Sequence, residues 1–76
     1  MKTKYKYIFF EEDRKFDNKP LYICRNNKSK SELAMIFYYA TWKQYCFTQS
    51  GSDIVLSQDC LLDIADFLKQ LNGEKG

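Results

Sequence analysis

Few side chains in this 76-residue sequence are suited to catalysis or to metal binding. Histidine, the commonest general base and metal ligand, is absent. The three cysteines have no CxxC spacing, and the three glycines form no phosphate-binding loop. We therefore expect a protein that is not an enzyme and that requires no metal and no cofactor.

One cysteine and one row of aspartates remain as candidates for nucleophilic catalysis or cation binding, and each has a simpler structural explanation. Cys60 falls in the first turn of a predicted helix, where the helix dipole favours a reactive thiolate, but it also lies on the apolar side of that helix. Because free cysteine often packs as a small hydrophobe, we interpret Cys60 as an inert thiol. Asp59, Asp63 and Asp66 form a straight acidic ridge that does not enclose a cation, so we interpret the ridge as a solvated helix face.

Basic residues gather in two stretches and suggest an alternative function, nucleic-acid binding. They are Lys2, Lys4, Lys6, Arg25, Lys28 and Lys30. With the interleaved rings of Tyr5 and Tyr7, they resemble a surface that contacts phosphates and stacks on bases. Lysines on an edge strand also prevent strand-to-strand aggregation, and a net charge of +2 is too small to indicate nucleic acid by itself.

An amphipathic helix over residues 58–72 is the clearest secondary-structure element. Ser57 is suited to the N-cap, and Gly73 can adopt the left-handed conformation that ends a helix. Apolar side chains recur at helical spacing along one side of this segment. Five of them are expected to pack on a sheet: Leu61, Ile64, Ala65, Leu68 and Leu71.

Apolar stretches that precede the helix predict β-strands, because they are short and are separated by polar, turn-forming residues. The predicted strands cover residues 3–10, 21–25, 33–39, 42–48 and 54–56. Successive strands followed by one helix indicate an α+β fold. We expect a single domain over residues 1–76, in which an antiparallel sheet meander of four to five strands packs against one C-terminal helix.

The central predicted strands are apolar on both faces. Ala34, Ile36 and Tyr38 alternate with a second apolar set, so that each set lies on one face of the sheet. One helix covers only one face of such a sheet. The other face carries Met35, Phe37, Tyr39, Trp42 and Cys46.

Contiguous apolar residues on an uncovered face are typical of interaction sites. We therefore expect these five residues to bind a partner protein. A homodimer would bury the same face by two-fold symmetry. The structural alternative is that the sheet is strongly twisted and its rings cover one another, or that the N-terminal strand and its loop fold over them.

The sequence also indicates a compartment. Three cysteines without a pairing pattern indicate free thiols in a reducing environment. No apolar run is long enough to span a bilayer, and the N-terminal lysines are not followed by the apolar region of a signal peptide. We expect a cytoplasmic protein that does not interact with membranes.

Three segments carry a resemblance to known proteins: the strand at residues 33–36, the segment at residues 42–47 and the helical ending at residues 57–72. Residues 33–72 resemble a family of small uncharacterised proteins from bacteria and their phages. Proteins of this group often have Trp where Tyr38 stands and Pro in the following turn, and both are missing here.

The resemblance implies an antiparallel sheet with a C-terminal helix and a phage or mobile-element setting. It implies no catalytic residues. In that setting we expect the protein to dock on a host protein, for example as an inhibitor of a defence nuclease in the manner of an anti-CRISPR protein.

Overall fold

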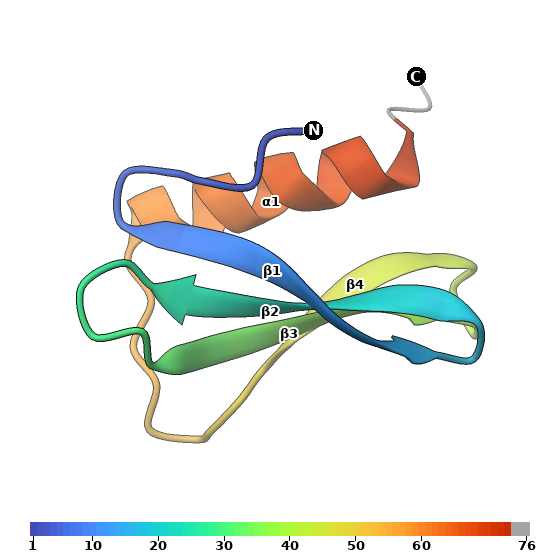
Figure 1. Cartoon of the computed structure of the whole chain (residues 1–76), viewed down its shortest axis with the longest axis horizontal. Helices are drawn as coiled ribbons and strands as arrows, with labels where there is room; N and C mark the ends of the chain where they lie inside the picture. The colour runs from blue at the N-terminus through green and yellow to red at the C-terminus, as the bar shows by residue number, and fades with distance from the viewer. Residues whose placement is uncertain (74–76) are drawn as a thin grey trace.

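The computed structural model describes residues 1–73, in which one helix lies across one face of a four-stranded antiparallel sheet (Figure 1). The strands are ordered β1-β2-β3-β4, as in a meander. Their bounds are β1 Ile8–Phe16, β2 Lys19–Asn26, β3 Glu32–Tyr39 and β4 Gln44–Gln49, and helix α1 is Gln58–Asn72. The predicted α+β fold is therefore confirmed; residues 74–76 of the predicted domain lie outside the described residues.

Helix α1 begins and ends where the sequence predicts. The Ser57 hydroxyl accepts a hydrogen bond from the Cys60 N–H at 3.2 Å, and Gly73 ends the helix with a φ of 79°. Within residues 1–73, no helix is long and apolar enough to cross a membrane.

The hydrophobic core lies between α1 and the side of the sheet that faces it. Phe67 is fully buried at its centre. The Phe67 ring stacks on Phe10 with 4.0 Å between ring centroids and meets Tyr22 edge to face at 5.1 Å. The other buried members of this cluster are Ile8, Cys24, Ala34, Ile36 and Ile64.

The helix packs through a narrower stripe than its whole apolar arc. Leu61 and Ala65, which the sequence predicts in the contact, are exposed, so this part of the prediction is wrong. Leu68 and Leu71 are partly buried and pack against the core. Because the helix contacts the sheet only along the centre of its apolar arc, the border residues of the arc stay in solvent.

Strand β1 begins later than the predicted strand over residues 3–10. The chain before it folds back: the Phe10 N–H donates to the Thr3 carbonyl at 2.8 Å, and the Tyr5 N–H donates to the Ile8 carbonyl at 2.9 Å. Alternating hydropathy at residues 3–10 therefore reflects two short segments that lie side by side rather than one continuous strand.

Strand β1 also runs further than predicted, through the charged residues 11–15. Glu11 lies opposite Ile23 and Glu12 lies opposite Tyr22, and a bulge falls between Glu12 and Lys15. Main-chain hydrogen bonds to β2 hold this half of β1, since its side chains are exposed and contribute little burial.

The two hairpin turns differ in length. Asp17 and Asn18 connect β1 to β2 with φ of 56° and 68°, the positive values that a two-residue type I′ turn requires. The β3–β4 turn is longer than predicted, because Trp42 lies in the turn and not in β4. Its N–H donates to the Tyr39 carbonyl at 3.1 Å, and Lys43, with a φ of 55°, leads into β4.

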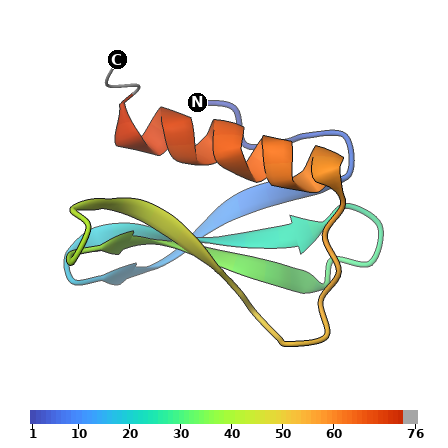
Figure 2. The same ribbon diagram turned by 180° about the vertical axis from the view of Figure 1, so that it is seen from behind.

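The predicted fifth strand over residues 54–56 is absent from the described part of the chain. The connection from β4 to α1 is irregular and swings away from the helix before it returns (Figure 2). Leu56 packs against the core, whereas Val55 is exposed. Packing of Leu56 against the core, and not strand pairing, thus accounts for the buried part of this segment. The predicted strands at residues 21–25, 33–39 and 42–48 correspond to β2, β3 and β4 with small shifts at their ends.

Candidate functional site

The face of the sheet opposite α1, which we call the outer face, is apolar at its centre. Ile23 lies opposite Met35, and Phe37 lies opposite Cys46. The alternate residues of β2 and β3, which are Tyr22, Cys24, Ala34 and Ile36, belong to the core that faces the helix. The outer face therefore contains Leu21, Ile23, Met35, Phe37, Tyr39 and Cys46.

Side chains of the sheet itself cover part of the outer face. Leu21 and Ile23 are only 8% and 7% exposed, although they lie outside the core cluster that includes α1. Trp42, at the margin, is 65% exposed. Coverage by neighbouring side chains thus accounts for the low exposure of the outer face on β2 but not for the exposure of its margin at the β3–β4 turn.

Four rings form a continuous series along this margin, which we call the aromatic line: Phe16, Phe37, Tyr39 and Trp42. Successive ring centroids are 6.3, 6.0 and 5.3 Å apart, and each pair meets edge to face. This geometry is favourable for aromatic pairs. The line runs along the end of the sheet where the β1–β2 and β3–β4 turns lie together (Figure 1). Contacts within the line fix the orientation of rings that remain accessible.

The structure places the residues predicted to bind a partner close to one another. The outer face holds four of them, and Trp42 lies in the adjoining turn: Met35, Phe37, Tyr39, Cys46 and Trp42. Sequence reasoning missed Phe16, which is flanked by charged residues. Its position directly before the Asp17-Asn18 turn is the signal that would have placed it at the same end of the sheet.

A hollow of about 260 Å³ lies on the outer face, and its lining residue Met35 is two residues from Phe37 of the aromatic line along β3. Leu21, Ile23 and Met35 form its apolar floor. Charged side chains of both signs surround this floor: Asp13, Arg14, Arg25 and Glu32. An apolar centre with a mixed charged rim is the usual composition of a protein-binding surface.

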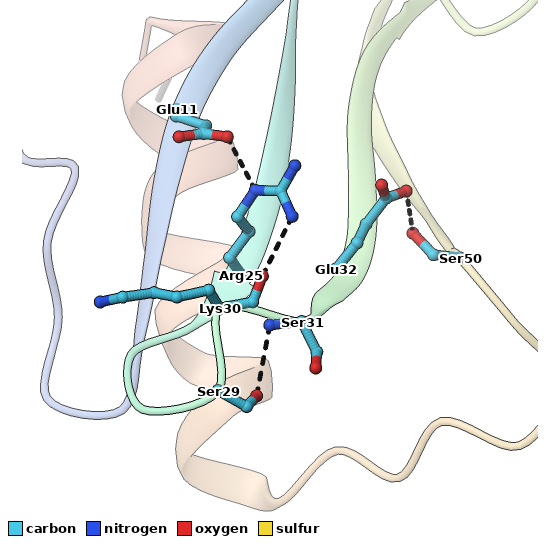
Figure 3. Close-up of polar contacts among 7 residues, drawn as sticks. All are labelled: Glu11, Arg25, Ser29, Lys30, Ser31, Glu32 and Ser50. Atoms are coloured by element: carbon cyan, nitrogen blue, oxygen red, sulfur yellow. Dashed lines mark hydrogen bonds and ion pairs between the residues drawn. The ribbon is translucent and has the colours of Figure 1, made fainter.

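Arg25 is held in a fixed position at this rim (Figure 3). Its Nε donates to Glu11 Oε2 at 2.7 Å, and its Nη1 donates to the Lys30 carbonyl at 3.0 Å. The hydrogen bond to Glu11 raises the pKa of the Arg25 guanidinium above its ordinary value. On β3, Glu32 accepts a hydrogen bond from Ser50 Oγ at 2.6 Å. Arg25 is therefore already engaged with a carboxylate, which argues against the phosphate contact predicted for it.

Part of the predicted basic surface comes together at the opposite end of the sheet. The Asn27 side-chain amide donates to the carbonyls of Tyr5 and Lys6 at 3.0 and 2.9 Å, so the N-terminal segment is joined to the β2–β3 turn. This contact between segments distant in sequence gathers four lysines: Lys4, Lys6, Lys28 and Lys30.

Two accessible aromatic rings lie among these lysines: the predicted Tyr7, which is exposed with Lys6 Nζ 5.2 Å from its ring centroid, and Phe9, which the sequence does not indicate. Phe9 lies with Lys4 and Lys30 around a hollow of about 230 Å³, and Lys30 Nζ is 5.3 Å from the centroid of the Phe9 ring. Tyr5, in contrast, donates its hydroxyl to Asp66 at 2.7 Å and is partly buried. Its ring is therefore not free to stack on a base.

The candidates for catalytic chemistry are not assembled into a site. Burial raises the pKa of the Cys24 thiol to about 12, so this thiol stays protonated at neutral pH. Cys60 is half-buried and packs against the core. In the part of the chain that the structure describes, no group of three or more Cys, Asp or Glu residues could hold a metal ion.

Two amide side chains at the end of α1 bind main-chain groups of other segments. Gln70 accepts from the Lys2 N–H at 2.8 Å and donates to the Lys2 carbonyl at 2.9 Å. Asn72 accepts from the Tyr45 N–H at 2.7 Å and donates to the Tyr45 carbonyl at 3.3 Å. Each amide thus pairs with one residue as a neighbouring strand would. The main chain of Lys2 is consequently held beside the helix, and Lys2 Nζ lies 4.6 Å from the centroid of the Tyr5 ring.

Beside the Asn72 contact, a groove of about 470 Å³ lies between β4 and α1. Trp42, Tyr45 and Phe47 line its strand side, and Ala65 and Leu68 line its helix side. Trp42 therefore borders both this groove and the aromatic line.

Comparison with known proteins gives no relative from which a role could be transferred. No protein-family model, no curated protein and no solved structure matches the chain.

Proposed function

We propose that this protein is a non-catalytic, cytoplasmic binding protein that docks on another protein through the outer face, with the aromatic line at the centre of the contact. The aromatic line carries the proposal. Trp42 and Phe16, at its two ends, are 65% and 54% exposed although each ring contacts the next ring in the line. Orienting contacts limit the conformational entropy that an aromatic anchor loses on binding, and such anchors tend to dominate binding energy.

The surroundings of the aromatic line support a protein rather than a polyanion as the partner. The rim of the neighbouring hollow carries Asp13 and Glu32 as well as Arg14 and Arg25. Carboxylates at a contact surface repel phosphates, whereas a mixed rim suits the polar margin of a protein surface. In line with the resemblance to bacterial and phage proteins, the partner is a host protein, for example a defence nuclease that the protein inhibits.

Truncation of the exposed ends of the aromatic line tests this function. We expect Trp42→Ala and Phe16→Ala each to weaken binding to the captured host protein by about 2 kcal/mol or more, roughly 30-fold in Kd. The measurement is affinity capture from bacterial lysate, followed by titration of the identified partner with each variant. Tyr7→Ala removes an exposed ring at the other end of the sheet and should leave Kd unchanged.

Melting curves of the same variants separate binding from folding. Phe37 is less suited to this test because it lies between Phe16 and Tyr39 and is partly buried. If Trp42→Ala and Phe16→Ala are both folded and bind the partner as tightly as the unchanged chain, docking through the outer face is wrong.

Nucleic-acid binding is a second candidate function, because the Asn27 contacts gather Lys4, Lys6, Lys28 and Lys30 around one end of the sheet. Phe9 takes the place of Tyr5 as a ring available for stacking, and the predicted Tyr7 is exposed beside Lys6. On this alternative, affinity falls steeply with salt because phosphate contacts release counterions.

Gel shifts with single- and double-stranded DNA and RNA across a salt series test this alternative. Lys4→Ala combined with Lys6→Ala should flatten the salt dependence by about two charges. Lys69→Ala, on the exposed side of α1, is the matched control. The absence of any shift at low salt would eliminate the alternative.

A further inference from the structure

The two edges of the sheet are protected very differently. Strand β1 carries charged side chains throughout residues 11–15, has a bulge between Glu12 and Lys15, and pairs with the N-terminal segment at Lys4 and Phe9. Charges, bulges and covering segments are the usual means of blocking an edge strand. Strand β4, with the sequence QYCFTQ, has no charge, no proline and no irregularity in its register with β3. The edge at β4 is therefore open to strand pairing.

The register of β4 shows which main-chain groups point away from the sheet. The Tyr45 N–H and carbonyl point outward, because both bind Asn72. Main-chain direction alternates along an antiparallel strand, so the groups of Phe47 and Gln49 point outward as well. In residues 1–73 the sheet contains no strand beyond β4. Phe47 and Gln49 thus present donors and acceptors on the open edge, while Tyr45 is already occupied.

We propose that β4 pairs antiparallel with β4 of a second copy of this chain, with the two-fold axis at Thr48. This register keeps the hydrogen bonds between Tyr45 and Asn72 intact. It pairs Phe47 of each copy with Gln49 of the other. It keeps both paired residues within the strand. The β3–β4 register shows that the groups of Thr48 face β3, so the two Thr48 residues form a close, non-hydrogen-bonded pair on the axis.

Charge complementarity favours a second copy over another occupant of this edge. Exposed Lys43 directly precedes β4, and exposed Asp53 follows it. With the axis at Thr48, the start of β4 in one copy, which Lys43 precedes, meets the end of β4 in the other, which leads to Asp53, so opposite charges fall at the same end of the contact. At the centre, the facing threonines are a favourable cross-strand pair. No like charges meet along the paired segment.

This association goes beyond the proposed function and does not depend on it. Pairing at the edge of β4 leaves the outer face uncovered in both copies and extends it into a single, longer sheet. The aromatic lines of both copies stay accessible to partner proteins.

A matched pair of substitutions at Gln49 tests the role of its main chain. Gln49→Pro and Gln49→Ala both remove the side-chain hydrogen bond to the Ile54 carbonyl, but only Gln49→Pro removes the outward N–H. By analytical ultracentrifugation of the full chain, we expect a mass twice that of the monomer for the unchanged protein and for Gln49→Ala, and a monomer for Gln49→Pro. Melting curves establish that Gln49→Pro is folded.

Cysteine crosslinking tests the register directly and does not rely on a destabilising change. In a Cys46→Ser background, Thr48→Cys should form a disulfide-linked dimer on oxidation, because non-hydrogen-bonded pairs lie within disulfide reach. Gln44→Cys, on the same face of the same strand, should not crosslink, since the two introduced sulfurs would lie more than about 20 Å apart.

Three results would overturn the pairing of two β4 strands. They are a monomeric unchanged chain at its highest soluble concentration, crosslinking of Gln44→Cys as efficient as that of Thr48→Cys, and dissociation of the dimer by Trp42→Ala. A monomer whose binding to a partner protein is abolished by Gln49→Pro would assign the edge to a partner peptide instead. If the protein does not bind a partner through the outer face, its oligomeric state is unaffected. The two proposals can therefore be refuted independently.

Discussion

At the residue scale, the side-chain amides of Gln70 and Asn72 make tertiary contacts that no pattern in the sequence predicts. A carboxamide offers one acceptor and a donor group, which match the N–H and carbonyl of a single residue. Gln70 uses this match on Lys2 and Asn72 uses it on Tyr45, so the last turn of α1 is fastened to the N-terminal segment and to β4. Asn72 also covers part of the edge at β4 and so limits which strand residues are open to pairing.

Replacement of Asn72 measures the value of this contact. We expect Asn72→Ala to lower the free energy of unfolding by about 1–3 kcal/mol, because it leaves the partly buried N–H and carbonyl of Tyr45 without their partner. Urea unfolding is the measurement. Leu62→Ala, at an exposed position of the same helix, should change the value by no more than about 0.5 kcal/mol. Equal losses for the two variants would contradict a specific role for the amide.

At the element scale, α1 is anchored through one narrow stripe. Phe67 lies between Phe10 and Tyr22 and is fully buried, while Leu61, on the same apolar arc, is 45% exposed. Helical periodicity identifies the arc, but the contact with the sheet decides which members of the arc carry stability.

Two truncations on α1 separate the centre of this stripe from its border. We expect Phe67→Ala to cost about 3–5 kcal/mol, because it removes a buried ring and leaves a cavity between Phe10 and Tyr22. Leu61→Ala should cost far less, since much of its side chain is already in water. Thermal and urea unfolding compare the two, and a larger loss for Leu61→Ala would refute this orientation of the helix.

At the scale of the whole molecule, Tyr5 connects the N-terminal segment to α1. Its hydroxyl donates to Asp66 at 2.7 Å and accepts from Gln70 Nε2 at 3.1 Å, and its ring meets Phe10 edge to face. Burial, and then the hydrogen bond to Asp66, raise the pKa of Tyr5 well above its ordinary value of 10.0. The folded state therefore retains the phenol proton at a pH where the unfolded chain loses it.

This difference predicts how stability changes at alkaline pH. The contribution of Tyr5 is fully present below about pH 10 and is lost as the pH rises above that value, because only the unfolded state then releases the proton. We expect Tyr5→Phe to be less stable than the unchanged chain at pH 7, with a difference that shrinks above pH 10. Urea unfolding across a pH series, with Tyr7→Phe as the control, measures it; a constant difference would contradict the linkage.

The sequence by itself determined the order and type of the main elements. The bounds of α1 follow from Ser57, Gly73 and the apolar period, all of which act within a few residues of chain. The two-faced apolar pattern of residues 33–39 likewise predicted that Met35, Phe37 and Tyr39 would lie away from the helix. These features depend on residues close together in the sequence, so they can be predicted without knowing which distant segments pack together.

Only the tertiary structure decided the features that depend on contacts between distant segments. The charged half of β1 is a strand because β2 pairs with it, and Phe16 joins the aromatic line because two turns meet at one end of the sheet. The Asn27 side chain brings the N-terminal lysines close to those of the β2–β3 turn. The Asn72 side chain occupies Tyr45, so that the open edge of β4 is limited to Phe47 and Gln49. Both contacts are hydrogen bonds between residues at least 21 positions apart in the sequence. Every residue except proline offers the same main-chain donor and acceptor, so the partner of each is set by the fold and leaves no pattern in the sequence.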